Sequence, residues 1–274
     1  IWLFITSENM EFLLTMTIAK DIMYCHRAYR KLSERIRSRQ LFDFFAMSLP
    51  FVALIIFLTP TILYFFNAAA QHFLRLSFGN SVGVVNTPYP LFGNLSLIVL
   101  MGSYPTPLYC VGLSLVSIIG VVVLMSMRGI ARSVSVYVSF VLLITLISSL
   151  FFLFTPERFP YNIEGFSDLY IKTELGIWCT IPLILSMSLL MLPSSLAERM
   201  GIIALALLYS LIFGLARYVI FLYIIGHYSY VYMAPMFIAF DPPLDTIYIV
   251  GIYSIYMSIV SKRYRKDSDI WQCS

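Results

Sequence analysis

Charged residues are scarce in this sequence. They make up 12% of the chain, whereas a soluble domain carries about 25%. Hydrophobic residues make up 60%, and the mean hydropathy is +0.86. This balance excludes an ordinary soluble domain and predicts an all-α polytopic membrane protein with about five or six transmembrane helices. The 274 residues leave little room for a soluble domain that would bind a nucleotide or a nucleic acid.

Cysteine and histidine are also rare, with four and three residues respectively. The cysteines stand at positions 25, 110, 179 and 273 and form no Cys-x-x-Cys pair. The sequence therefore indicates neither a redox pair nor a structural zinc site. We expect no metal and no cofactor.

Basic residues gather at the two ends of the chain. In the N-terminal segment 1–43, apolar and basic positions alternate at roughly helical spacing between residues 19 and 41. This pattern predicts either an amphipathic helix on the membrane surface or a solvated charged face before the first span. Residues 262–274 form a basic tail. The positive-inside rule places both ends on the same side of the membrane.

Three membrane spans are expected within residues 44–154, at 44–66, 108–127 and 134–154. Between the first two, residues 67–109 mix turn-forming and apolar residues, which predicts a connection that stays close to the membrane. Residues 155–173 are the most polar connection and should face the side opposite the ends of the chain. A last span is expected at about 246–261.

An apolar run of 52 residues, 175–226, contains only Glu198, Arg199 and Arg217 as charged residues. A single span needs only about 20 residues. The run is therefore either two spans that turn at the charged pair, or one long tilted helix with an arginine inside the membrane. An arginine in mid-membrane is costly and would indicate function.

The segment leading to Arg199 resembles the one that precedes the essential arginine in subunit a of rotary F-type ATP synthases. Pro193 lies six residues before Arg199, and Leu196 lies three before it. In the last span, Asp245 is followed eleven residues later by Tyr256, which is similar to a glutamine and a tyrosine of the family's final helix. The resemblance covers residues 178–261.

The resemblance implies a proton-translocating stator subunit with a long tilted helical hairpin over residues 174–261. Arg199 would lie in mid-membrane, face the c-subunit ring and separate two proton half-channels. The implied partners are the c-ring, other membrane and peripheral-stalk subunits, and lipids. A divergent member of this kind would suit a protist mitochondrial inner membrane. The candidate proton-carrying residues are Arg199, Asp245, Asp241, His227, Glu174 and Glu198.

Two other functions are open on the sequence. Membrane cysteine transpeptidases of the exosortase and archaeosortase type use a Cys, an Arg and a His on three successive spans. Cys179, Arg217 and either His227 or Asp241 stand in that order. The third possibility is a polytopic subunit without chemistry of its own. The depth of Arg199 in the membrane and the distance between Cys179 and Arg217 distinguish the three.

Overall fold

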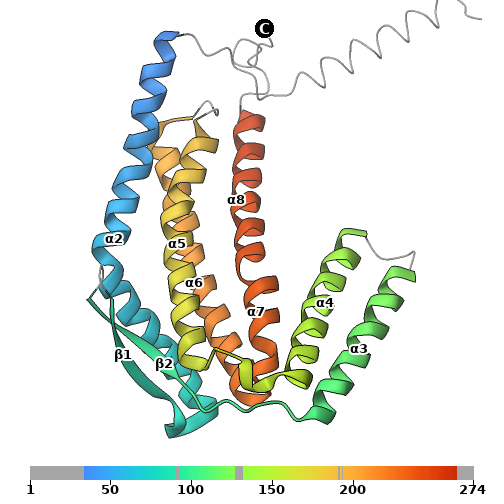
Figure 1. The fold of residues 1–274 in the computed structure, drawn as a ribbon. Coiled ribbons are helices and arrows are strands. Elements are labelled where there is room, and N and C mark those ends of the chain that lie inside the picture. The colour runs from blue at the N-terminus through green and yellow to red at the C-terminus, as the bar shows by residue number, and fades with distance from the viewer. Residues whose placement is uncertain (1–33, 90–92, 127–131, 191, 193, 264–274) are drawn as a thin grey trace, which may run out of the picture.

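The computed structural model describes residues 34–89, 93–126, 132–190, 192 and 194–263, which are mostly helical (Figure 1). Six segments of the described chain are long and apolar enough to cross a membrane. They are Leu41–Ser81, Pro107–Ser126, Arg132–Phe154, Ile163–Leu189, Leu196–His227 and Tyr230–Arg263. The prediction of an all-α polytopic membrane protein is confirmed at this level.

Helix α2, Glu34–Phe78, is longer than the span expected at 44–66. It continues through Pro50 and Pro60, which a helix tolerates within a membrane, where neighbouring groups satisfy the freed carbonyl groups. The surface segment and this span belong to one helix from Glu34 onward, and the candidate membrane span begins at Leu41, close to the expected boundary at residue 43. Residues 19–33 of the expected amphipathic helix lie outside the described part of the chain.

A β-hairpin follows α2, where the sequence predicted only an irregular connection. Gly79 has a φ of 59° and begins a short 3-10 turn, Gly79–Ser81, which ends α2. Strands β1, Gly83–Tyr89, and β2, Gly93–Val99, then pair antiparallel, with Gly83 opposite Val99. Leu97 and Ile98 are buried in the apolar core shared with α2 and α5. The hairpin therefore closes one side of the bundle (Figure 1).

Helices α3, Pro107–Ser126, and α4, Arg132–Phe154, form a helical hairpin. Their bounds confirm the spans predicted at 108–127 and 134–154. The Ser114 and Ser149 hydroxyl groups bond across the pair at 2.7 Å. The pair leans away from α8 in Figure 1 and joins the bundle mainly through α4, where Ser148 donates to the Val231 carbonyl at 2.6 Å.

The 52-residue apolar run divides into two helices, α5, Ile163–Leu189, and α6, Leu196–His227. Ser195 caps α6 by accepting a hydrogen bond from the Glu198 N–H at 3.3 Å, which fixes the start of the helix. The prediction of one long helix through Arg199 is therefore wrong. The polar connection is also shorter than predicted, because α5 begins at Ile163, capped by Asn162, and includes residues 163–173.

The C-terminal span is broken. A 3-10 turn, Tyr230–Tyr232, leads into α7, Met233–Phe240, and α8 runs from Pro242 to Arg263. Asp241 lies between the two helices with φ −91° and ψ −87°. Pro242 and Pro243 explain the break, because proline disfavours a helical conformation in the preceding residue and suits the first turn of a new helix. The break leaves the Phe240 carbonyl free to accept other donors, while the Asp241 carbonyl accepts from the Asp245 N–H at 3.3 Å at the start of α8.

The start of α2, the turn between α5 and α6, and the end of α8 lie at one end of the bundle, as Figure 1 shows. We call this the basic end, because Arg199, Lys262 and Arg263 belong to it. The opposite end holds the turn between α6 and α7. Two apolar cores follow from this arrangement, one around α2, α5, α6 and the β-hairpin, and one between α5, α6 and α8 near the basic end.

Candidate functional site

Arg217 is buried near the middle of α6, with 3% of its side chain exposed. It lies eighteen residues after Arg199 and ten before His227. At about 1.5 Å per residue, these separations place it about 27 Å from the level of Arg199 and about 15 Å from that of His227. Arg217 therefore lies well inside the candidate span Leu196–His227.

Three buried carboxyl groups surround the Arg217 guanidinium. Asp245 binds both terminal nitrogens, with Nη1–Oδ1 and Nη2–Oδ2 distances of 3.0 Å. Glu174 Oε1 accepts a further hydrogen bond from Nη2. Asp241 Oδ1 lies 2.9 Å from the same nitrogen. Glu174, Arg217, Asp241 and Asp245, together with Tyr170, are here called the Arg217 cluster.

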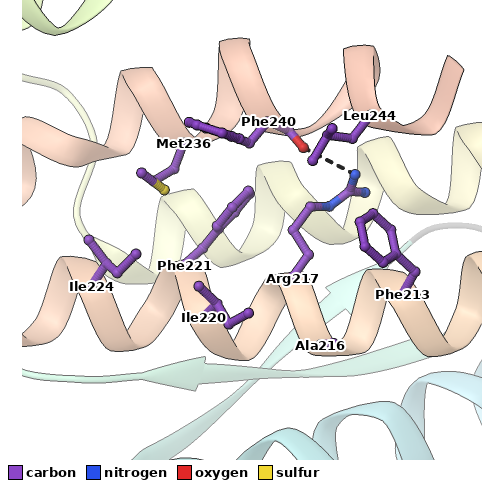
Figure 2. Close-up of a pocket in the computed structure, with 9 residues that line it drawn as sticks. All are labelled: Phe213, Ala216, Arg217, Ile220, Phe221, Ile224, Met236, Phe240 and Leu244. Atoms are coloured by element: carbon purple, nitrogen blue, oxygen red, sulfur yellow. Dashed lines mark hydrogen bonds between the residues drawn. The ribbon is translucent and has the colours of Figure 1, made fainter. Parts of the chain in front are cut away.

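The backbone and Tyr170 hold the guanidinium on its other sides. Nη1 donates to the Asp241 carbonyl at 2.9 Å. It also lies 3.3 Å from the Phe240 carbonyl, and Figure 2 shows this second contact as a dashed line. Nε donates to the Tyr170 hydroxyl at 3.0 Å. The break between α7 and α8 thus supplies the Phe240 carbonyl, an acceptor that an unbroken helix would use internally. The two backbone carbonyl groups that hold the arginine do not titrate.

Gly214 allows α5 and α6 to approach closely at this point. A Cβ atom at Gly214 would lie 2.8 Å from Glu174 Oε1, closer than such contacts allow. The Tyr170 hydroxyl lies 2.6 Å from Glu174 Oε1 and 2.8 Å from the Gly214 carbonyl, and its single hydrogen is shared between them. The absent side chain therefore makes room for the Glu174 carboxyl group.

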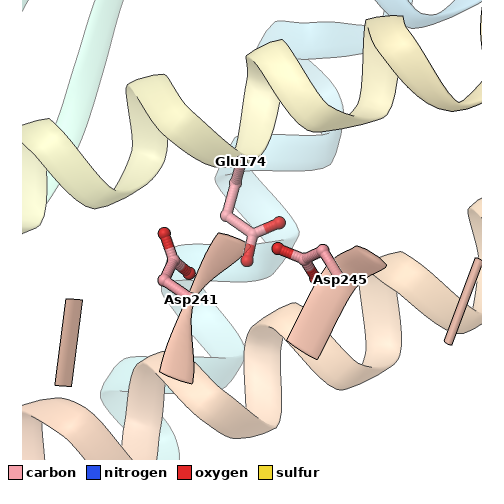
Figure 3. A group of neighbouring side chains, drawn as sticks. All are labelled: Glu174, Asp241 and Asp245. Carbon is pink, nitrogen blue, oxygen red and sulfur yellow. The ribbon is translucent and has the colours of Figure 1, made fainter. Parts of the chain in front are cut away.

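Asp241 is the least satisfied member of the cluster. It is completely buried, and neither of its carboxyl oxygens accepts a hydrogen bond from any described residue. Nη2 lies close to it but has only two hydrogens, which Glu174 and Asp245 accept. Glu174 Oε2 is also without a donor in the described chain. Figure 3 shows the three carboxyl groups pointing toward one another.

The cluster has more acidic than basic groups. One guanidinium faces three carboxyl groups, so the net charge would be −2 if all four were ionised. The three acids each offer an oxygen within 4.8 Å of the others, a spread that one cation could bridge, and carboxylate oxygens suit hard divalent ions. However, Nη2 of Arg217 already contacts the same three acids. A cation bound there would compete with the guanidinium for the same carboxyl groups.

An apolar cavity of about 290 Å³ adjoins the cluster between α6 and α7, with Arg217 in its wall (Figure 2). Phe213, Phe240 and Met236 are among its lining residues. The guanidinium carbon lies 5.6 Å from the centre of the Phe213 ring. The surroundings of the cluster on this side are therefore apolar, which strengthens the electrostatic interactions inside it.

No known protein family, characterised protein or solved structure matches this chain. The function must therefore be argued from the geometry of the site.

Three of the six predicted proton-carrying residues, Glu174, Asp241 and Asp245, meet in the Arg217 cluster, while the other three lie elsewhere. Arg199 stands in the first turn of α6 and donates to Ser194 Oγ at 3.2 Å and to the Leu192 carbonyl at 2.7 Å. Its predicted position in mid-membrane is wrong, because the chain turns directly before it.

Glu198 and His227 lie at opposite ends of α6. Glu198 pairs with Arg263 at 2.8 Å and so joins the basic ends of α6 and α8. His227 is the last residue of α6, where its ring stacks on Tyr223 with 5.7 Å between the ring centres. Neither residue reaches the Arg217 cluster.

The residues of the predicted transpeptidase alternative are only partly brought together. Arg217 contacts Asp241, but His227 is about 15 Å further along α6. Cys179 follows Glu174 by five residues, which places it about 140° around α5 from the face that meets Arg217. It packs instead against the apolar core. In this structure Glu174 occupies the position on α5 that faces the arginine.

Proposed function

We propose that this protein binds protons within the membrane and passes them on at the Arg217 cluster. The observation that carries this proposal is the charge balance, because three buried carboxyl groups face a single guanidinium. An unpaired charge in a buried site costs several kcal/mol, so a fully ionised cluster would be strongly destabilised. Two protons shared among the three acids make the cluster neutral and give it protons to release.

Arg217 and the acids have different roles in this proposal. Arginine stays protonated at any physiological pH, and here the backbone of the α7–α8 break holds it in place. It therefore supplies a constant positive charge. Asp241 needs a proton most, because neither of its carboxyl oxygens accepts a hydrogen bond from a described residue. Glu174 and Asp245 share the guanidinium with it, so a proton can move among the three while the arginine stays fixed.

Infrared difference spectroscopy of the full-length protein in lipid vesicles tests the proposal. Protonated carboxyl groups have a C=O stretch that disappears when they ionise, and we expect the wild-type protein to show it. Glu174→Gln, Asp241→Asn and Asp245→Asn should each weaken this band and lower the potential-driven proton flux by about 100-fold. Asp168→Asn is the matched control, because Asp168 pairs with exposed Lys172 on the same helix as Glu174.

The absence of a protonated carboxyl band in the wild-type protein, together with an unchanged flux in the Glu174→Gln variant, would refute the proposal. A reduced flux in the Asp168→Asn control would show that any acid lost from α5 has the same effect. That result would also count against a specific role of the cluster.

A second candidate is the stator subunit of a rotary F-type ATP synthase. It is supported by the sequence resemblance in the last span, where Tyr256 follows Asp245 by eleven residues. It is also supported by the length of the last two spans, Leu196–His227 and Tyr230–Arg263, which pack against each other. In this role the arginine within the span is Arg217, and the partners would be a c-subunit ring, peripheral-stalk subunits and the lipids of a mitochondrial inner membrane. Copurification of the c-ring and stalk subunits in mild detergent tests it. If the purified protein conducts protons without a c-ring and stalk subunits, this second candidate is refuted and the proton-binding proposal stands.

A further inference from the structure

All three acids of the Arg217 cluster are buried, with at most 3% of each residue exposed. A proton can therefore reach water only through other hydrogen-bonding groups or through water that enters the bundle. Tyr248 is such a group on the side of the basic end. It follows Asp245 by three residues on α8, so the two side chains occupy neighbouring positions on one face of the helix.

Ser210 continues this connection on α6. The Tyr248 hydroxyl donates to Ser210 Oγ at 2.7 Å, and Ser210 is 1% exposed. Ser210 precedes Arg217 by seven residues, or about 10 Å toward the basic end. A phenol has one hydrogen, so Tyr248 can donate either to Ser210 or to Asp245. When it donates to Ser210, as here, it can accept a proton from a protonated Asp245.

We infer that Tyr248 and Ser210 carry protons between Asp245 and the basic end of the bundle. This inference rests on the proposed function and adds a direction to it. The Ser210 hydroxyl accepts from Tyr248 and so keeps its own hydrogen for donation further along α6. Two helices thus contribute one hydroxyl each to a path that begins at the cluster.

The path meets an apolar layer beyond Ser210. The buried side chains in this direction include the apolar Ile181, Leu185, Ile203 and Ala206, in the core between α5, α6 and α8; the hydroxyl of Ser186, next to Leu185 on α5, is also buried. Polar groups return near the basic end, where the Tyr256 hydroxyl lies 3.4 Å from Glu198 Oε2. Tyr256 follows Tyr248 by eight residues, which corresponds to about 12 Å. This layer limits proton passage on that side in the structure.

Substitutions that add or remove one oxygen atom test the inference in vesicles containing the full-length protein. Tyr248→Phe and Ser210→Ala should each lower the proton flux by about 100-fold, and the double variant should lower it no further. Tyr209→Phe is the matched control, since its ring packs on Tyr248 at 5.0 Å between centres while the Tyr248 hydroxyl bonds Ser210. Thermal unfolding of each variant shows whether the fold is kept.

Ala206→Ser tests the direction of the path. Ala206 is fully buried one helical turn before Ser210, so a hydroxyl there extends the path into the apolar layer. We expect a higher flux than in the wild-type protein, which a merely structural role of Ser210 would not produce. An unchanged flux in Ala206→Ser would overturn the direction. A wild-type flux in Tyr248→Phe, with the flux abolished in Glu174→Gln, would overturn the inference and leave the proposed function standing.

Discussion

Replacing Arg217 by glutamine should destabilise the protein far more than replacing Arg199. Glutamine keeps much of the length of the side chain but removes its charge. Glu174 and Asp245 would lose a charged donor, and the three acids would face one another without any cation. Arg199 is half-buried and bonds Ser194 and the Leu192 carbonyl, so its loss leaves no carboxyl group unpaired in the interior.

The expected losses of unfolding free energy in the two variants differ severalfold. Removing one partner of a buried ion pair costs about 3–5 kcal/mol, and this is the value expected for Arg217→Gln. The hydrogen bonds of Arg199 suggest a cost of about 1 kcal/mol for Arg199→Gln. Adding Asp245→Asn to Arg217→Gln should recover part of the lost unfolding free energy, because it removes one of the three acids that no longer face a cation.

Trp178 fluorescence provides the assay. This residue follows Glu174 by one helical turn on α5, is 3% exposed and packs against Phe66 with 6.0 Å between the ring centres. Its emission should report the loss of packing around the cluster as the purified protein is unfolded in detergent. Equal stability of the Arg217→Gln and Arg199→Gln variants would refute the reasoning, because it would mean that the buried acids do not depend on the guanidinium.

Two further predictions concern the close approach of α5 and α6 and the free thiol. Gly214→Ala should lower both stability and proton flux, because the new Cβ would lie 2.8 Å from Glu174 Oε1. Gly201→Ala on the same helix has no atom within 4 Å and should raise the unfolding free energy by up to about 1 kcal/mol. Cys179→Ala should leave proton flux unchanged, since Cys179 packs against the apolar core; a peptide-transfer activity lost in this variant would instead support the transpeptidase alternative.

Hydropathy was sufficient to predict the spans that are apolar on all sides. The predicted bounds of α3 and α4 agree with the structure within two residues, because each is a single apolar run between polar turns. The β-hairpin could not be predicted in this way. Strand β2 takes its place from the burial of Leu97 and Ile98 against α2 and α5, and such short apolar segments look the same in a helix or a loop.

The run 175–226 shows how a local signal was given too little weight. Ser194 and Ser195 are typical residues at the start of a helix, and Ser195 does cap α6. The prediction of one helix instead followed the resemblance around Arg199. A family resemblance between two short motifs does not determine where a helix begins, whereas a capping side chain does.

The acids of the site were predictable, but their common partner was not. Charged residues are so rare in the spans that Glu174, Asp241 and Asp245 were candidates on their presence alone. Arg217 was a candidate only in the transpeptidase alternative. Its pairing depends on how α5, α6 and α8 come together, and on a helix break that directs two backbone carbonyl groups toward it.

The order of these residues along the chain also has a consequence for membrane insertion. An arginine at the centre of an isolated helix costs about 2.5–3.5 kcal/mol to insert. Glu174 on the preceding helix is already synthesised when α6 emerges, whereas Asp245 is not. We therefore expect α5 and α6 to enter the bilayer as one paired unit, with α8 completing the ion pairs later during synthesis.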